Sequence, residues 1–241
     1  GDAGLLQDMD KAIALLQKAI QQNTKIRIIG DYDIDGIQST YILHQGLLRV
    51  GADADYAIPD RIEDGYGVNI RLMERCVMDG IGLVITCDNG IAAAEEIAYA
   101  KSMGMTVVVT DHHEVPYTEI GGERRYILPE ADAVVDPKQE DCTYPFKGLC
   151  GAAVAYKLVE ALMEAMGKDA EDADYLMENV AIATIGDVMD LKDENRIFVK
   201  QGLEMLGHTN NLGLRALIEC TGINKDAINP YHIGFVLGPC I

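Results

Sequence analysis

The sequence predicts an α/β fold: a parallel sheet with helices on both faces, followed by a mainly helical C-terminal part. Over the first 135 residues, short apolar runs alternate with longer segments whose apolar residues recur every three or four positions. The runs are nearly continuous in apolar character, which is typical of strands buried on both faces. Beyond residue 147 such runs largely stop, so the remainder is predicted to be helical.

The first predicted element is a helix over residues 5–22, because apolar residues recur there at three- and four-residue steps. The alternating region follows it, and residues 114–132, with two prolines and a Gly-Gly pair, predict a long surface loop. The predicted strands are 25–29, 54–58, 83–87, 106–110 and 133–135. The predicted helices between and after them are 39–49, 68–78, 92–102, 148–166, 175–185, 196–206 and 212–220.

Composition sets the broad class. The 241 residues are 49% hydrophobic and 24% charged, which suits a globular chain that buries a core. No apolar run approaches the ~20 residues of a membrane span, and the N-terminus lacks the pattern of a signal peptide. The six cysteines form no C-x-x-C pair, and Cys76, Cys87 and Cys220 lie in apolar or helical patterns. Reduced core thiols in a cytoplasmic protein are therefore expected.

The net charge of −19 argues against a simple nucleic-acid binder, which usually presents a basic stripe. Two circumstances would reconcile such a charge with a nucleic-acid substrate. Bound dications would neutralise part of a carboxylate cluster, and basic surface would lie on parts of the protein outside this chain.

Acidic residues follow three of the predicted strands. The carboxyl ends of parallel strands meet at one edge of a sheet, where ligands bind. Carboxylates gathered with an imidazole indicate a divalent-metal site, and such sites hydrolyse phosphate esters. The residues that follow the three strands are Asp31, Asp33 and Asp35, then Asp88, then Asp111, His112 and His113.

Several of these residues also have ordinary interpretations. Asp35 alone would serve as a helix cap. Asp88 begins an Asp-Asn-Gly turn, for which turn and ligand are equally good interpretations. Asp187 ends an apolar helical stretch, where a turn residue is favoured over a ligand. Asp136 follows the last strand and is expected to support the site, with Lys138 as a phosphate contact.

The chain resembles the N-terminal catalytic region of the RecJ-type single-stranded-DNA-specific exonucleases of the DHH phosphoesterase superfamily. The matching stretches run in order through nearly the whole chain. They are GDYDIDG at 30–36, IPDRIEDGYG at 58–67, VITCDNGI at 84–91, VTDHH at 109–113, VDPKQEDCTYPFKGLCG at 135–151, IATIGDVMDL at 182–191 and ENR at 194–196.

The resemblance implies two divalent metal ions, Mn²⁺ or Mg²⁺, and assigns a role to each site residue. Their implied ligands are Asp33, Asp35, Asp88, His112 and Asp187, with Asp31 as a further ligand or a supporting residue. His113 would face the substrate, and Asp111 would orient a histidine or fix the turn. Three basic residues within the motifs are candidates for phosphate contacts, with structural ion pairs an equally good alternative: Arg61, Lys138 and Arg196.

The implied activity is 5′-to-3′ removal of nucleotides from single-stranded DNA, in repair and recombination. Two alternatives stand beside it. Members that act on short oligonucleotides or cyclic dinucleotides begin their first motif with a histidine, where this chain has Ile29. A non-catalytic member that only binds partners is disfavoured by the intact set of acids and histidines.

The resemblance also suggests how the chain is divided. Residues 1–24 would form an N-terminal helix, 25–190 the DHH catalytic domain, and 191–241 a helical extension that leads to a second domain. The apolar segment 233–241 suggests a fragment of a longer protein. The expected partners are single-stranded DNA, the second domain, an OB-like module and repair proteins, with no membrane.

Overall fold

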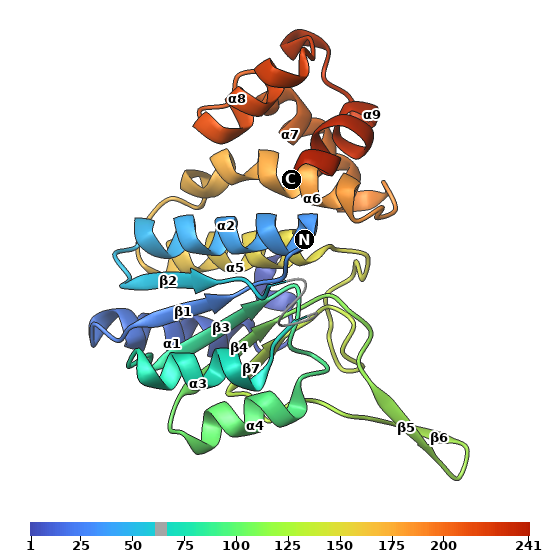
Figure 1. Cartoon of the computed structure of the whole chain (residues 1–241). Helices are drawn as coiled ribbons and strands as arrows, with labels where there is room; N and C mark the ends of the chain where they lie inside the picture. The colour runs from blue at the N-terminus through green and yellow to red at the C-terminus, as the bar shows by residue number, and fades with distance from the viewer. Residues whose placement is uncertain (61–66) are drawn as a thin grey trace.

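The computed structural model describes residues 1–60 and 67–241 and is built on a parallel sheet (Figure 1). Its five strands lie in the order β2-β1-β3-β4-β7, and every neighbouring pair is parallel. The α/β prediction is therefore confirmed. The strands are β1 (Ile26–Ile29), β2 (Ala54–Ala57), β3 (Leu83–Cys87), β4 (Thr106–Thr110) and β7 (Ala133–Val135).

Helices cover both faces of this sheet, as the continuous apolar strands require. One apolar core joins the sheet to α1 (Met9–Gln21), α2 (Ile34–Arg49) and α5 (Gly151–Ala165). A second core on the opposite face joins it to α3 (Ile70–Met78) and α4 (Ala94–Ser102). Strands such as β3, buried at every position, show why an apolar run without alternation marks a central parallel strand.

A helical part follows α5 and stacks beyond α2 and α5 (Figure 1). Its core includes Ile182, Leu206, Leu214 and Ile233. The first of its helices, α6, packs against α2, α5 and α7, and so joins this part to the sheet unit. The elements are a 3-10 helix (Ala170–Leu176), α6 (Met177–Gly186), α7 (Asp193–Leu206), α8 (Leu212–Thr221), a 3-10 turn (Lys225–Ala227), α9 (Pro230–His232), a π-helical turn (Ile233–Leu237) and a last 3-10 turn (Gly238–Cys240).

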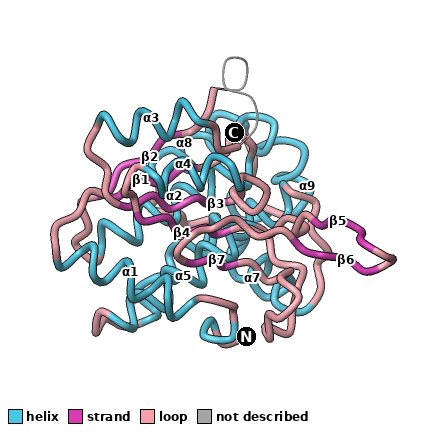
Figure 2. Tube along the Cα trace, turned by 90° about the horizontal axis from the view of Figure 1, so that it is seen from below, coloured by secondary structure: helices cyan, strands magenta, loops and turns pink. Residues whose placement is uncertain are grey.

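The predicted loop 114–132 is wrong, because it contains a β-hairpin. Strands β5 (Tyr117–Ile120) and β6 (Glu123–Tyr126) pair in antiparallel register around Gly121 and Gly122, both of which have positive φ. All eight strand residues are exposed. The hairpin stands away from the body (Figures 1 and 2). Neither face of it packs on a core, so it lacks the apolar alternation from which a strand is predicted.

Other boundaries differ from the predictions in instructive ways. Helix α2 begins at Ile34, well before the predicted residue 39, because the Asp33 side chain caps it by accepting a hydrogen bond from the Gly36 N–H at 2.9 Å. Cys76 and Cys87 are buried as predicted, whereas Cys220 is exposed, and all six cysteines are free. Among the described helices, none has the length and apolar character needed to cross a bilayer.

Candidate metal centre

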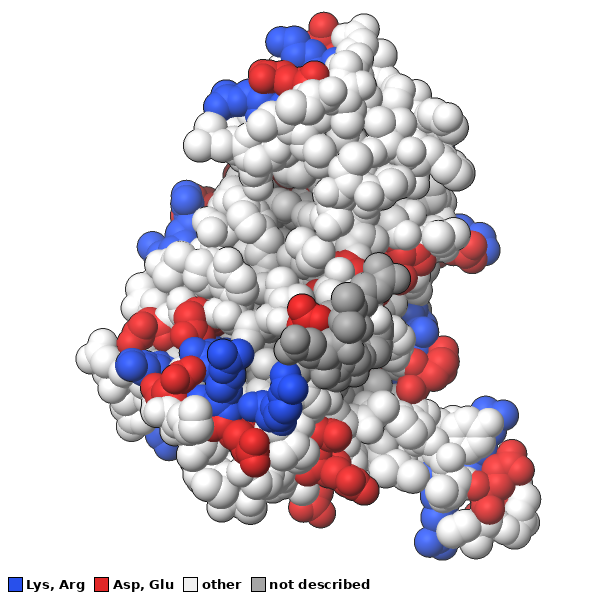
Figure 3. Space-filling view, in the orientation of Figure 1, with Lys and Arg blue, Asp and Glu red and all other residues white. Residues whose placement is uncertain are grey.

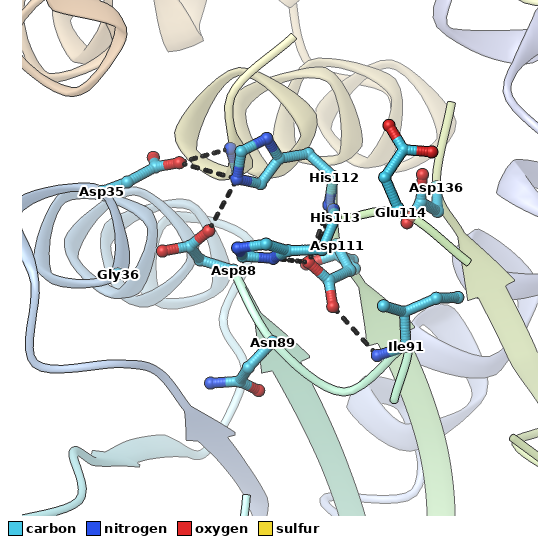
Figure 4. Close-up of polar contacts among 12 residues, drawn as sticks. Asp35, Gly36, Asp88, Asn89, Ile91, Asp111, His112, His113, Glu114 and Asp136 are labelled. Carbon is cyan, nitrogen blue, oxygen red and sulfur yellow. Dashed lines mark hydrogen bonds and ion pairs between the residues drawn. The ribbon is translucent and has the colours of Figure 1, made fainter. Parts of the chain in front are cut away.

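Four side chains from four separate elements converge beyond the carboxyl ends of β1, β3 and β4, and Figure 4 shows three of them, Asp35, Asp88 and His112. Asp35 lies in the first turn of α2, Asp88 follows β3, His112 follows β4, and Asp187 caps the end of α6. His112 Nε2 lies 3.1 Å from Asp88 Oδ1, 3.5 Å from Asp35 Oδ2 and 3.7 Å from Asp187 Oδ2. One imidazole nitrogen thus faces three carboxylates.

Asp88 is the least satisfied member of this cluster. It is 1% exposed, yet neither of its carboxylate oxygens accepts a hydrogen bond from the described residues. Nδ1 of the buried His112 likewise has no hydrogen-bond partner there. A buried carboxylate that accepts no hydrogen bond is costly unless a cation compensates its charge. The donor set, oxygen-rich with imidazole, is of the kind that Mn²⁺ and Mg²⁺ accept, so these residues fit a divalent ion.

Two overlapping groupings of potential ligands share His112. Asp88, His112 and His113 form one, and Asp35, His112 and Asp187 form the other, with ligand atoms within 4.8 Å of one another in each. His113, expected to face the substrate, therefore also lies within ligand distance.

The crowding of carboxylates shows in their protonation. Burial, reinforced by the charge of Asp35, raises the pKa of Asp88 well above its usual range. Burial also raises the pKa of Asp35. Burial and the neighbouring charges of Asp35 and Asp33 raise the pKa of Asp187 to about 6. The cluster therefore resists carrying its full negative charge without a cation beside it.

The amino end of α5 holds Asp35 in place. The N–H of Gly151 donates to Asp35 Oδ2 at 2.6 Å, and the N–H of Ala152 donates to Oδ1 at 2.8 Å. Free amides at a helix start bind anions readily. A Cβ on Gly151 would lie 2.7 Å from the Cβ of Asp88, so only glycine allows this approach. The matching stretch 135–151 ends at Gly151, but its sequence does not indicate that the backbone amides of Gly151 and Ala152 bind Asp35.

Two of the expected ligands lie in the same loop but outside both groupings. Asp33 Oδ1 is engaged in capping α2. Asp31 is fully buried, and its Oδ1 accepts the Tyr32 N–H at 2.6 Å. A Cβ added to Gly36 would lie 2.6 Å from the Cβ of Asp31, so Gly36 is needed for close packing within the loop.

Asp111 and His113 form a pair next to the cluster. His113 Nδ1 lies 2.7 Å from Asp111 Oδ1, and the other oxygen of Asp111 accepts the Ile91 N–H at 2.9 Å. The hydrogen bond to Asp111 raises the pKa of His113. Burial opposes ionisation of Asp111, but hydrogen bonds from His113 and backbone amides outweigh it and lower the pKa of Asp111. His113 is therefore oriented and biased toward the imidazolium form.

The candidate basic residues are placed differently from one another. Lys138 Nζ pairs with Glu114 at 3.1 Å, and the Lys138 N–H donates to Asp136 Oδ1 at 2.7 Å. Asp136 is fully buried beneath this turn, and burial raises its pKa to about 8. Arg196 is exposed on α7 and has no ion pair to the cluster within the described ranges. Arg61 lies outside the described residues.

Asn89 is a functional-loop residue that the sequence interpretation overlooked. Its Nδ2 donates to the Gly30 carbonyl at 2.8 Å and so joins the loops after β1 and β3, which present Asp35 and Asp88. Its backbone carbonyl accepts the Thr86 hydroxyl at 2.8 Å, which holds the turn after β3. Asp88 itself has φ +59°, a left-handed conformation that aspartate and asparagine tolerate better than most residues. The Asp-Asn-Gly turn thus also presents the candidate ligand Asp88.

A cleft of about 310 Å³ adjoins the cluster on the side of His113. Its wall is largely apolar and backbone, including Val68, Ile91 and Ala92, with Glu96 and Glu114 among its polar residues. His113 therefore borders a space lined with acidic and apolar groups.

Comparisons with known proteins match this arrangement. The chain is 42% identical to the single-stranded-DNA-specific exonuclease RecJ of Bacillus subtilis (strain 168) over 234 residues, 97% of this chain and 28% of that protein. It is similar to the crystal structure of exonuclease RecJ bound to manganese, with TM-score 0.83 and 33% identity over 97% of this chain and 56% of the other. RecJ in complex with Mn²⁺ from Thermus thermophilus gives TM-score 0.79 and 31% identity, over 97% of this chain and 32% of that one.

These matches confirm the resemblance inferred from the motifs, and the structures with Mn²⁺ support a divalent metal as cofactor. The chain spans well under half the length of the first curated relatives that it matches, 28% and 41%. The description "DHH family, N-terminal domain" matches residues 25–184, which include three of the four converging side chains. The chain belongs to the DHH family.

Proposed function

We propose that this chain is the catalytic core of a metal-dependent exonuclease that removes nucleotides from single-stranded DNA in the 5′-to-3′ direction. The observation that carries the proposal is the convergence of Asp35, Asp88, His112 and Asp187, with both oxygens of the buried Asp88 lacking a hydrogen-bond partner among the described residues. The relatives named as single-stranded-DNA-specific exonucleases support the choice of substrate.

The metal ligands in this proposal are Asp35, Asp88, His112 and Asp187, with Asp31 and Asp33 joining through their remaining oxygens or supporting the loop. Two ions are proposed on the resemblance to the RecJ-type exonucleases, and the carboxylates gathered around His112 supply oxygen donors for both. A dication held there would supply a deprotonated water as nucleophile and would stabilise charge on the phosphoryl oxygens. Mn²⁺ or Mg²⁺ suits the oxygen-rich set.

The chain's own residues prepare the phosphate for attack. His113, held by Asp111 and biased toward the imidazolium form, is positioned to donate a hydrogen bond to a phosphoryl oxygen as negative charge develops there. Asp111 fixes the ring through Nδ1, which leaves Nε2 for the substrate. Lys138, beside Glu114 and Asp136, is a candidate for a neighbouring phosphate.

Binding of the single-stranded DNA requires a basic surface, and this chain supplies little of it. The net charge is −19, and Figure 3 shows Lys and Arg interspersed with Asp and Glu on the face it presents. We therefore assign most of the DNA grip to a second domain and an OB-like module of a longer protein, with Arg61 and Arg196 as further phosphate contacts. Residues 25–190 would be the catalytic unit and 191–241 the extension toward that domain. Repair proteins as partners and a cytoplasmic location belong to the same proposal.

A phosphodiesterase acting on short oligonucleotides or cyclic dinucleotides is the second candidate. Ile29, in place of the histidine with which such members begin their first motif, disfavours it. The relatives named above also favour a single-strand substrate.

The test is a Mn²⁺-dependent assay of the complete gene product on 5′-labelled single strands, duplex, dinucleotides and cyclic dinucleotides. The expected result is mononucleotide release from single strands, with little cleavage of duplex. Cleavage of dinucleotides alone would overturn the exonuclease proposal. The activity of the chain 1–241 by itself, measured in parallel, tells how much of the DNA binding depends on the other domains.

A further inference from the structure

Six helices of this chain end in the same way. After each of α1 to α6, a residue in the left-handed conformation donates its N–H to the carbonyl three positions back, and the next N–H reaches five positions back. This pattern satisfies the last carbonyls of a helix and favours glycine or asparagine. The residues at this position are Asn23, Gly51, Gly80, Gly104, Gly167 and Val188.

Val188 is the exception in this series. Its φ is +55°, and it is the one β-branched residue with positive φ in the described ranges. A branched Cβ crowds the backbone in this conformation, so valine is among the most costly choices there. Its side chain is also 86% exposed, so packing within the described chain does not compensate for the strain. Stability alone would favour glycine at this position, as at four of the other helix ends.

The location of Val188 suggests what valine supplies. It directly follows Asp187, whose Oδ2 lies 3.7 Å from His112 Nε2, and adjacent Cα atoms are only about 3.8 Å apart. The turn is held firmly, because the Val188 N–H donates to Ile185 O and the Met189 N–H to Thr184 O, both at 3.1 Å. Strained residues that persist beside a reactive centre commonly have a function there. An uncharged branched side chain suits a sugar or base rather than a phosphate.

We propose that Val188 is a substrate-contact residue that packs against the nucleoside whose phosphate lies at the metal centre. This inference rests on the function proposed above. Neither the motifs nor the relatives' names assign a role to Val188. The exposed Val188 side chain becomes buried when the nucleotide binds, and the contact is made before and during the reaction alike. It therefore contributes to binding of the strand and not to the chemical step.

The test compares Val188→Gly, Val188→Ile and Asn23→Gly in the complete gene product. Asn23→Gly is the matched control, because it alters the same kind of helix end at the start of β1, the opposite end of that strand from the metal centre. Three quantities are measured: Tm without DNA, the Mn²⁺ dissociation constant, and kcat and KM on a 5′-phosphorylated oligo(dT). Val188→Gly is expected to raise Tm, leave Mn²⁺ binding and kcat within about twofold, and raise KM about tenfold.

Val188→Ile, which keeps an apolar branched side chain, is expected to retain a KM close to that of the original protein, and Asn23→Gly to change neither kcat nor KM. A normal KM in Val188→Gly overturns the inference while the proposed function stands. A lower Tm in Val188→Gly also overturns it, because Val188 would then pack on another part of the complete protein. If the original protein does not degrade single strands at all, the proposed function fails and this inference fails with it.

Discussion

The backbone N–H of Gly151 donates to Oδ2 of Asp35 at 2.6 Å, across 116 positions of sequence. The start of α5 thereby fixes a candidate metal ligand that lies on α2. The same glycine leaves room for Asp88, since a Cβ at this position would fall 2.7 Å from the Asp88 Cβ. One residue without a side chain thus sets the spacing of two carboxylates.

Gly151→Ala is expected to weaken Mn²⁺ binding by at least about tenfold, the range seen when residues that support metal ligands are altered. The added methyl group would push Asp88 away from His112 and Asp35. Isothermal titration of the metal-free chain with Mn²⁺ checks this. Gly234→Ala is the control, because a Cβ there meets nothing closer than 3.9 Å. Equal Mn²⁺ affinity in both variants would contradict the assigned role of Gly151.

Asp88→Asn is expected to have opposite effects on stability and on activity. Removing a buried carboxyl that the neighbouring aspartates repel should raise the Tm of the metal-free chain by a few degrees, roughly 2–4 °C per kcal/mol gained. Loss of the ligand should lower phosphodiesterase activity by more than about 100-fold. Thermal unfolding in EDTA and a Mn²⁺ assay measure the two effects.

Asp10→Asn provides the comparison for Asp88→Asn, because Asp10 is exposed on α1. It should change neither the Tm nor the activity. If Asp88→Asn retained full activity, Asp88 would not be a metal ligand.

The stability of the metal-free chain is expected to fall as the pH rises from about 5 to 8.5. The pKa of Asp187 is raised to about 6 and that of Asp136 to about 8, both from 3.8. Between the unfolded and folded pKa values the folded state holds protons that the unfolded state has lost, so the free energy of unfolding decreases with rising pH. Tm measured in EDTA across this range tests the sign.

One variant and one added ion separate the contributions of Asp136 and Asp187 to this pH dependence. Asp136→Asn should flatten the upper part of the slope, above about pH 6. Mn²⁺ should raise Tm more at pH 8 than at pH 5, because a dication favours the charged form of Asp187. A Tm that climbs through this range in EDTA would be inconsistent with buried, uncompensated carboxylates.

Asp111→Asn is expected to lower the pKa of His113, because the hydrogen bond to Asp111 is the largest influence that raises it. NMR titration of the histidine rings in the metal-free chain measures this directly. His44, distant in sequence and packed against Tyr56, serves as the internal reference for the ring signals. An unchanged His113 titration would show that Asp111 acts only through its bonds to the backbone N–H groups of Ile91, His112 and His113.

Most of the sheet could be predicted because burial on both faces produces short, nearly continuous apolar runs such as Thr106–Thr110, each bounded by turn residues. The hairpin Tyr117–Tyr126 could not, since strands exposed on both faces carry no apolar pattern. A helix start is predicted too late where capping precedes the apolar repeat, as at Asp33. Both errors are local and leave the predicted sheet topology unchanged. That topology is what brings the acidic residues together at one edge of the sheet.

The site was predictable where it depends on topology and unpredictable where it depends on backbone atoms. Asp35, Asp88 and His112 follow parallel strands, so their meeting follows from the fold class. Asp187 arrives on a helix, and only the resemblance assigned it. The amides of Gly151 and Ala152 carry no sequence signal, because nearly every residue has an N–H and its use depends on where the helix starts.

The position of Asp187 on α6 has a consequence for the chain as a polymer. A cation held by Asp35, His112 and Asp187 would join segments far apart in the sequence and act as a reversible cross-link between the sheet and the first helix of the helical part. Folding already brings Asp35 and Asp187 together, so the cation would add no further cost in loop-closure entropy. Metal binding would therefore be coupled to the packing of the helical part against the sheet. A chelator would remove the metal and also weaken that packing.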